Sequence, residues 1–303
     1  MSFEDWINNW LTVWCRRLRA STLASYTSLV RLYLLPFWAD KALESITPED
    51  VQTAIDRALD AGHGRTAEML FDVLRACFRR AVRVRHLEHS PVDGVDSPVF
   101  TRKTVSALSD GILSQFCAEA VKQPLWPAYA LMLYAGLRRG EVIALRWCDV
   151  DMPGGVLHVR QNAVAVDGRL QIGAPKSAAG LRDVPLLDPL PEILRARRVA
   201  ALRAGCAGAE CPVIVSSASG GMVTPSGLQS GLRRMQRAVP ALDGVTLHAL
   251  RHTYATRLQE QGLNIKSLQY VLGHSSSRLT LDTYCTARYN SVEADFVKCG
   301  LAF

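Results

Sequence analysis

The sequence lacks the features of several protein classes. It contains no run of 18 apolar residues, so it indicates no membrane span. Residues 1–6 are acidic and aromatic, unlike a secretory signal peptide. The eight cysteines have no metal-ligand spacing, and we expect reduced thiols in a cytosolic protein rather than a disulfide framework. Walker motifs, Rossmann glycine motifs and internal repeats are also missing, so nothing indicates a P-loop, dinucleotide-binding or repeat protein.

Composition and charge indicate a globular chain with one basic part. Hydrophobic residues make up 49% of the 303 residues, enough for packed cores, and this length suggests about two domains. Residues 1–97 carry 12 Lys and Arg against 13 Asp and Glu, whereas residues 98–303 carry 23 against 15. A positive charge can be only a solvated surface. Its concentration in the second part favours a polyanionic partner there.

The first part reads as four helices. We expect them at residues 3–18, from 21 or 22 to about 37, from 48 to about 61, and at about 66–84. On the last of these, Arg75, Arg79 and Arg83 recur every four residues and form one stripe. Such a stripe is either a solubilising face or a contact for a phosphate backbone.

The second part follows a linker and combines helices with strands. Residues 90–107 are rich in Pro and Gly and end in a basic segment that contains Arg102 and Lys103, which could cross a DNA groove. Strands are predicted first at Val156, Val159 and Val164, then around residues 170–172 and 184–186. Basic helices are predicted at residues 189–205 and at about 224–238.

Residues 246–284 hold the side chains that suggest chemistry. His248 and Arg251 are three apart and share one face of a helix, and His274 and Tyr284 follow. Imidazoles, a guanidinium and a phenol at one point would suit phosphoryl transfer to the tyrosine. A zinc site at His248 and His252 is an alternative, but a hydrolase of that type has a Glu where Ala249 stands.

Three segments of this region occur together in one known family. They are the His-x-x-Arg box at residues 248–252, Leu-Gly-His at residues 272–274 and Thr-Tyr at residues 283–284. In this order and at this spacing they resemble the tyrosine recombinases, also called phage integrases. Residues 136–151 resemble the first-arginine motif of that family, and residues 175–186 resemble its lysine hairpin.

The resemblance implies roles for individual side chains. Arg138 would be the first catalytic arginine with Glu141 as a structural partner, and Lys176 would be the catalytic lysine at a hairpin turn. Without the resemblance, Arg138 and Lys176 would be ordinary solvated cations. The predicted catalytic set is Arg138, Lys176, His248, Arg251, His274 and Tyr284. The predicted DNA-binding set is Arg75, Arg79, Arg83, Arg102 and Lys103, and no residue is predicted to bind a metal.

The resemblance also implies a fold and a domain order. We expect a mainly α fold with a small antiparallel β-sheet (α+β). A helical core-type DNA-binding domain is expected at residues 1–97, a basic linker at residues 98–107 and the catalytic domain at residues 108–303. Because residues 3–18 read as the first core-binding helix, we expect no additional arm-binding domain before it.

By the same resemblance, the function is site-specific recombination. The chain would cut and rejoin DNA through a 3′-phosphotyrosyl intermediate without metal, ATP or other cofactor, and so integrate or excise a phage or other mobile element. Double-stranded target sites, a homotetramer on DNA and accessory DNA-bending proteins would be its partners in the cytoplasm of a bacterial host, with no membrane. Alternatives are chromosome-dimer or transposon resolution, a type IB topoisomerase, and a DNA-binding protein without catalysis.

Overall fold

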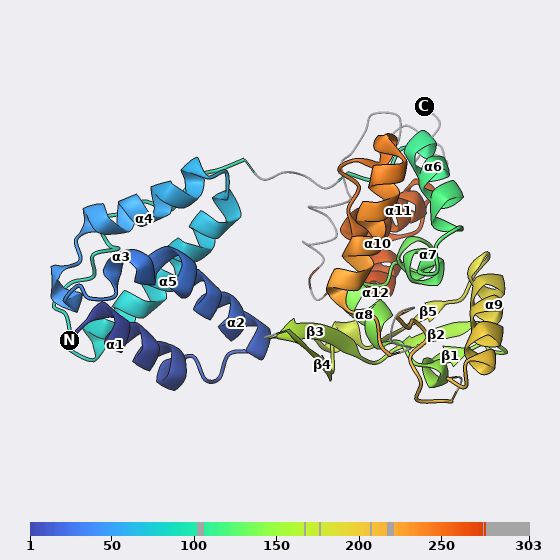
Figure 1. The fold of residues 1–303 in the computed structure, drawn as a ribbon, viewed down its shortest axis with the longest axis horizontal. Helices are drawn as coiled ribbons and strands as arrows, with labels where there is room; N and C mark the ends of the chain where they lie inside the picture. Colours follow the sequence, from blue (N-terminus) through green and yellow to red (C-terminus); the bar gives the residue numbers. More distant parts are fainter. Residues whose placement is uncertain are drawn as a thin grey trace, which may run out of the picture. The chain divides into compact units, whose positions relative to one another are not determined.

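The computed structural model describes residues 1–101, 106–166, 168–175, 177–206, 208–216, 221–274 and 276. The chain forms two compact units, of which the first holds residues 1–104 and the second holds most of residues 105–303. Helices dominate both units, and short antiparallel strands follow α8 and precede α9 in the sequence, which confirms the predicted fold class (Figure 1). No helix in the described part of the chain is both long enough and apolar enough for a membrane span.

The first unit consists of helical segments around one hydrophobic core. Its segments are α1 (Phe3–Asn9), η1 (Trp10–Trp14), α2 (Ala20–Leu29), η2 (Val30–Leu34), α3 (Leu35–Trp38), η3 (Leu43–Ser45), α4 (Pro48–Asp60) and α5 (Gly64–Arg83). The first predicted helix ends earlier than expected, at Trp14, in the π-helical turn η1. The second predicted helix is continuous but consists of α2, the π-helical turn η2 and α3.

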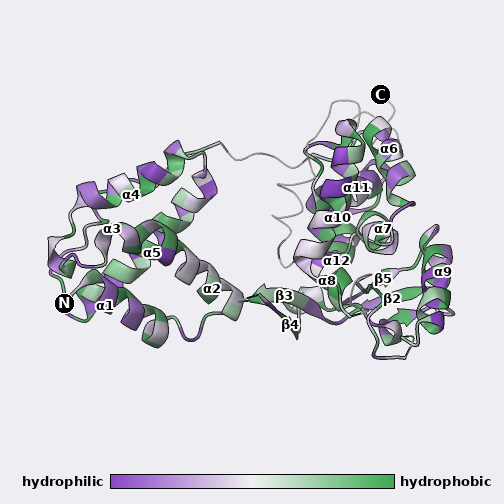
Figure 2. Cartoon of the chain, in the orientation of Figure 1, coloured by the Kyte–Doolittle hydropathy of each residue, from purple (hydrophilic) through white to green (hydrophobic). Residues whose placement is uncertain are grey.

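Local sequence explains how α4 and α5 form. Thr47 caps α4 by accepting a hydrogen bond from the Asp50 backbone N–H (3.3 Å), and the Asp50 carboxylate accepts from the Thr47 N–H (3.1 Å). Along both helices, hydrophilic and hydrophobic residues recur with the period of a helix that buries one face (Figure 2). The buried face of α5 includes Leu70, Leu74 and Phe78, so its arginines are left on the other face.

The second unit has seven α-helices among its described residues. They are α6 (Asp110–Ala120), α7 (Trp126–Tyr134), α8 (Arg139–Ala144), α9 (Leu190–Arg203), α10 (Pro225–Ala238), α11 (Leu247–Glu260) and α12 (Ile265–Leu272). Three 3₁₀ turns accompany them: η4 (Trp147–Asp149), η5 (Ala178–Gly180) and η6 (Pro240–Leu242). Helix α11 packs against α7 and α12, which places the end of α12 beside the turn between α7 and α8.

The described residues between α8 and α9 in the sequence form two small antiparallel sheets. One has the order β1 (Val150–Asp151), β2 (Val156–Val159) and β5 (Arg182–Pro185); the other pairs β3 (Asn162–Val166) with β4 (Arg169–Gly173). The prediction of one strand through Val156, Val159 and Val164 is therefore wrong, because the chain changes sheets after Val159. In the first sheet Leu157 pairs with Val184 and Val159 with Arg182. This register puts Arg182 on the same buried face as Val184.

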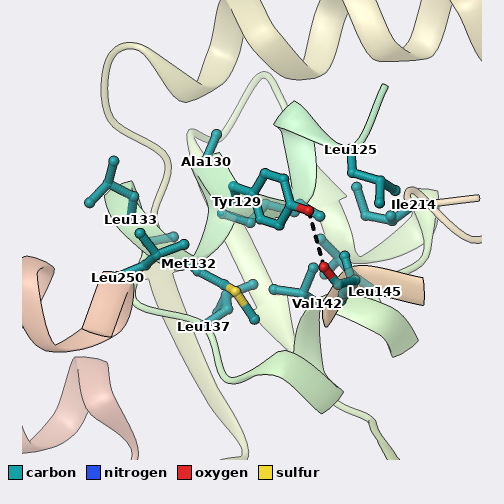
Figure 3. Packing of buried hydrophobic residues seen from close by; sticks show 14 of the residues in the cluster. Leu125, Tyr129, Ala130, Met132, Leu133, Leu137, Val142, Leu145, Ile214 and Leu250 are labelled. Atoms are coloured by element: carbon teal, nitrogen blue, oxygen red, sulfur yellow. Dashed lines mark hydrogen bonds between the residues drawn. The ribbon is translucent and has the colours of Figure 1, made fainter. Parts of the chain in front are cut away.

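The core of the second unit is centred on α7, whose residues are apolar on all sides. Tyr129 is buried among these residues, and its hydroxyl donates to the carbonyl of Leu228 (3.1 Å), so the polar atom is satisfied (Figure 3). Leu133 and Leu250 belong to the same core (Figure 3). The packing fixes α7 against α11. Helix α11 itself carries His248 and Arg251, and the turn after α7 carries Arg138.

Candidate active site

A cleft of about 590 Å³ opens in the second unit, with walls from α7, α8, β3, α10 and α11. Three residues of the predicted catalytic set line it: Arg138, His248 and Arg251. The uncharged side chains of Asn162 and Gln229 lie in the wall as well. Arg138 and Arg251, which are more than a hundred positions apart in the sequence, therefore line the same cleft.

Arg138 is positioned by the turn between α7 and α8. It is the N-cap residue of α8, and its backbone N–H donates to Glu141 Oε2 (2.8 Å). Its guanidinium donates to Glu141 Oε1 (2.8 Å) and to the carbonyl of Gly273 (2.9 Å). The side chain is still 37% exposed. Because a guanidinium has five N–H donors, Arg138 can bind an anion while these contacts persist.

Arg251 is held from inside the protein. Thr246 caps α11 by accepting from the Ala249 N–H (3.1 Å), and Arg251 follows in the next turn. The guanidinium donates to the carbonyls of Gly136 and Leu272, the latter at 2.6 Å. Only 2% of Arg251 is exposed. An anion in the cleft would meet a cation whose orientation is fixed before binding.

Both arginines depend on a glycine carbonyl. Gly136 and Gly273 each have φ of +61°, a conformation that residues with a β-carbon rarely adopt. A β-carbon on Gly136 would lie 2.4 Å from a ring carbon of Tyr254, and one on Gly273 would lie 2.8 Å from the carbonyl oxygen of Ala179. The Gly-Leu-Arg and Leu-Gly-His segments thus require glycine for steric reasons.

His274 completes the group beyond Gly273, which ends α12 in the left-handed conformation. Its Nε2 lies 3.1 Å from the terminal nitrogen of Arg251. Burial, followed by the positive charges of Arg251 and Arg138, lowers the pKa of His274 to about 4. The imidazole is therefore neutral at pH 7. Since Arg251 can only donate, Nε2 accepts and we assign the ring proton to Nδ1.

His248 lies one helical turn before Arg251 and lines the cleft. Burial, and then the charges of Arg251 and Arg138, lower its pKa, so it too is neutral and can accept a proton. His252, on the following turn, is buried, and its Nδ1 lies 3.3 Å from Thr256 Oγ1. Among the described residues, no three His, Cys, Asp or Glu side chains form a group that could hold a metal ion.

Sequence reasoning missed Arg182. Its guanidinium is fully buried and forms a two-pronged ion pair with Glu141 (3.0 and 2.9 Å), while its Nε donates to the carbonyl of Val271 (2.6 Å). Burial alone would raise the pKa of Glu141, but the hydrogen bonds and charge of Arg182, together with Arg138, hold this pKa at about 2. The sequence held one indication that Arg182 is buried. It lies two residues before Val184 in a predicted strand, so it shares the face that Val184 is predicted to bury.

Four of the six predicted catalytic residues thus lie together: Arg138, His248, Arg251 and His274. Lys176 and Tyr284 lie outside the described residues, as do Arg102 and Lys103 of the predicted DNA-binding set. Beside Lys176 in the sequence, Pro175 and Gly180 are buried and pack against each other, so a Cβ on Gly180 would lie 2.4 Å from Pro175 Cβ. Strands β4 and β5, which flank this segment, belong to different sheets, so these two strands do not form the predicted hairpin.

The arginine stripe belongs to the first unit. Arg75, Arg79 and Arg83 are exposed on α5, as the spacing predicts. Arg75 forms an ion pair with Asp72 (2.7 Å), and its guanidinium lies 5.3 Å from the centre of the Phe71 ring. An exposed pair of this kind contributes little to stability, so Arg75 remains available to a phosphate.

Comparison with known proteins extends these observations. Residues 111–291 match the phage integrase family, and residues 2–59 match the phage integrase N-terminal SAM-like domain. The integrase of Mycobacterium phage L5 is 26% identical over 287 residues, which span 93% of this chain and 74% of that protein. The tyrosine recombinase XerC of Rhodospirillum centenum is 30% identical over 247 residues, which span 79% of this chain and 65% of that protein.

A solved structure shows the same fold. It contains residues 82–397 of the Tn1549 transposon integrase in complex with a circular intermediate DNA. The two chains superpose with a TM-score of 0.83 and 21% identity, over 99% of each. The first family match alone spans more than half of the sequence. Of the side chains that the motifs of this family predict, Arg138, His248 and Arg251 line one cleft, and His274 lies beside Arg251. This chain therefore belongs to the phage integrase family of tyrosine recombinases.

Proposed function

We propose that the chain is a site-specific DNA recombinase that cuts and rejoins DNA through a 3′-phosphotyrosyl intermediate, with Tyr284 as the nucleophile. One observation supports this more than any other. Arg138 and Arg251 hold their guanidinium groups at a single cleft, beside the neutral imidazoles of His248 and His274. That arrangement suits a phosphodiester, which is anionic before the reaction and gains charge on its oxygens during it.

In the proposed first step the Tyr284 oxygen attacks the phosphorus, and the bond from phosphorus to the 5′-oxygen breaks. A phenol has a pKa near ~10 and is protonated at pH 7, so it needs a proton acceptor. His248 is neutral and lines the cleft, which makes it the acceptor. Lys176 would give a proton to the leaving 5′-oxygen, so the strand ends in a free 5′-hydroxyl.

The arginines would stabilise the transition state. Arg138 and Arg251 would donate to the non-bridging oxygens, and the Nδ1–H of His274 would add a third donor. Removal of one such preorganised donor typically slows a reaction by about 10²–10³-fold. Because Arg251 is fixed by backbone carbonyls before DNA binds, little reorganisation is required during the reaction.

Neither a metal ion nor ATP is required by this mechanism. The positive charges are supplied by side chains, and the phosphotyrosine conserves the energy of the broken phosphodiester. A 5′-hydroxyl from a partner strand can then reverse the first step: it attacks the phosphorus and releases Tyr284, which recovers its proton. Recombination of two duplexes breaks four strands, so four nucleophiles and a homotetramer on DNA are expected.

We propose that residues 1–97 bind the core of the target site, with Arg75, Arg79 and Arg83 on the phosphate backbone. Arg102 and Lys103 in the linker 98–107 would cross a groove, and residues 108–303 would carry the catalysis. Integration or excision of a phage or other mobile element in a bacterial cytoplasm is the role that fits the relatedness to a phage integrase and a transposon integrase. The XerC relative keeps chromosome-dimer resolution as the second candidate.

The test uses a DNA fragment that spans the gene for this chain and its flanking sequence. The wild type should leave protein attached to DNA after denaturation in detergent, and sequencing from the adduct should locate the cleaved phosphate. Tyr284→Phe should bind the same fragment without forming an adduct. Absence of any adduct with the wild type would count against a recombinase. An adduct that persists with Tyr284→Phe would move the nucleophile to Tyr254 or Tyr289.

A further inference from the structure

Arg182 does not line the cleft, although it belongs to the same group of charges. Its side chain is fully buried, whereas that of Arg138 is 37% exposed. The two arginines share one carboxylate: Glu141 Oε1 accepts from both guanidinium groups (2.8 and 3.0 Å), and Oε2 accepts from the Arg138 backbone and from Arg182 (2.8 and 2.9 Å). Four donors therefore saturate Glu141.

The charge balance of this triad determines what Arg138 offers to an anion. Two guanidinium cations and one carboxylate leave a net charge of +1. Without Arg182, Arg138 would face the carboxylate alone, and the pair would be neutral. A neutral pair attracts a phosphate much less than a cation does, especially in a partly buried cleft where charges are weakly screened. Arg182 thus compensates the carboxylate that orients Arg138.

Stability alone does not account for so costly an arrangement. Transfer of a guanidinium and a carboxylate from water to the interior is costly, and apolar residues of similar volume often stabilise a fold equally well. The contacts of Arg182 also connect the structural parts of the site. Its Nε donates to the carbonyl of Val271 near the end of α12, and its terminal nitrogen donates to the carbonyl of Gly180 (3.2 Å), four residues after Lys176 in the sequence.

We propose that Arg182 is a positioning residue that acts through Glu141: it neutralises this carboxylate, so that Arg138 is held in place and still presents a full positive charge to the phosphate. This inference rests on the proposed function, because it assumes that Arg138 binds the scissile phosphate. It assigns no contact with DNA to Arg182 itself.

The test compares two substrates in single-turnover cleavage, each built on the site recovered from the wild-type adduct. One carries the normal phosphodiester and the other a methylphosphonate, in which a methyl group replaces one non-bridging oxygen and removes the charge. Arg182→Met should cleave the normal DNA at least tenfold more slowly than the wild type. On the methylphosphonate the defect should fall to threefold or less, because there is no anionic oxygen for Arg138 to neutralise.

A second variant separates charge compensation from packing. Glu141→Gln combined with Arg182→Met removes both buried charges, so the charge of Arg138 is no longer cancelled. This double variant should cleave normal DNA at least fivefold faster than Arg182→Met alone. Arg146→Met is the matched control, since Arg146 also pairs with a buried acid, Asp149, but lies outside the cleft. It should show the same ratio of rates on the two substrates as the wild type.

Rates are expressed per folded molecule, as measured by near-ultraviolet circular dichroism. If Arg182→Met does not fold, Arg182→Lys is used in its place. A lysine retains the positive charge but cannot form the two-pronged contact with Glu141. The logarithm of its loss in cleavage rate should be less than half of that measured for Arg138→Ala. Equal defects on both substrates, or a double variant no faster than the single one, would overturn the inference. Wild type that forms no adduct would instead overturn the proposed function, so the two failures are distinguishable.

Discussion

Replacement of Glu141 by glutamine should destabilise the second unit by several kcal/mol. The pKa of this carboxyl falls from an ordinary 4.5 to about 2 in the folded chain. Since one pKa unit corresponds to ~1.4 kcal/mol, the fold favours the charged form by about 3 kcal/mol. Removal of one partner of a buried ion pair typically costs about 3–5 kcal/mol, which agrees. Glutamine has nearly the same shape, but its amide nitrogen would face the N–H groups of two arginines.

Hydrogen–deuterium exchange of the full chain measures this effect in the second unit separately from the first. A loss of about 3 kcal/mol should speed the exchange of amides in α8 and α12 by about 10²-fold, where these amides exchange through opening of the unit. Peptides from residues 1–101 should exchange as before. Glu260→Gln is the control, because Glu260 is exposed at the end of α11 and should change exchange little.

The pH dependence provides a further check on Glu141. Its folded pKa is depressed, so its contribution is fully present above pH 4.5 and is lost as the pH falls toward 2. The difference in the free energy of unfolding between wild type and Glu141→Gln should therefore shrink as the pH falls from 4.5 toward 2. A difference below ~1 kcal/mol at pH 7 would refute the idea that this carboxylate is the centre of a buried charge network.

Three other outcomes are expected. Gly136→Ala should slow adduct formation at least tenfold, because its β-carbon would collide with an aromatic ring and shift the carbonyl that holds Arg251. Gly205→Ala is the control, because Gly205 has φ of +69° and a β-carbon there would have nothing within 4 Å. This control carries only the backbone strain and should cleave DNA normally. The melting temperature should fall as the pH drops from 6.5 toward 4. The pKa values of His248, His252 and His274 are depressed in the folded chain, so the unfolded chain binds more protons than the folded chain in this range. A melting temperature that stays constant over this range would contradict the burial of these histidines. Lys176→Ala should cleave normal DNA slowly but should recover its rate on DNA with a sulfur in place of the bridging 5′-oxygen, because a thiol with a pKa near ~8.5 is a better leaving group. Arg251→Ala should not recover in the same single-turnover assay. Equal recovery of both variants would leave the lysine without a distinct role.

The sequence predicted four side chains that lie together in the candidate site, Arg138, His248, Arg251 and His274. It also predicted Glu141 as a structural partner, but it did not predict the role of Arg182. His248 and Arg251 could be placed together because a helix fixes residues three apart on one face. Their meeting with Arg138 was expected only from the family resemblance, because no local rule brings residues over a hundred positions apart into contact. The helix cap at Thr47 was predictable from its side chain and the acids that follow.

The parts that sequence reasoning missed depend on tertiary contacts. Arg182 looked like one cation among many, since a charged residue in a strand is normally exposed. Only the register of β5 against β2 shows that it points inward to Glu141. The break between β2 and β3 was missed for a similar reason: valines continue with a strand-like pattern across it, and the change of sheet leaves no mark on that pattern.

Arg251 and Arg138 are held by the main-chain carbonyls of Gly136 and Gly273, so these contacts can be kept while the surrounding sequence changes. A carbonyl group belongs to the main chain, so no substitution can delete it; only a changed backbone path can move it. Neighbouring side chains are then free to vary as long as the two left-handed turns survive. Retargeting could therefore begin with the uncharged side chains in the wall of the cleft, such as Asn162 and Gln229, while Gly136, Gly273 and the arginines and histidines of the site are kept.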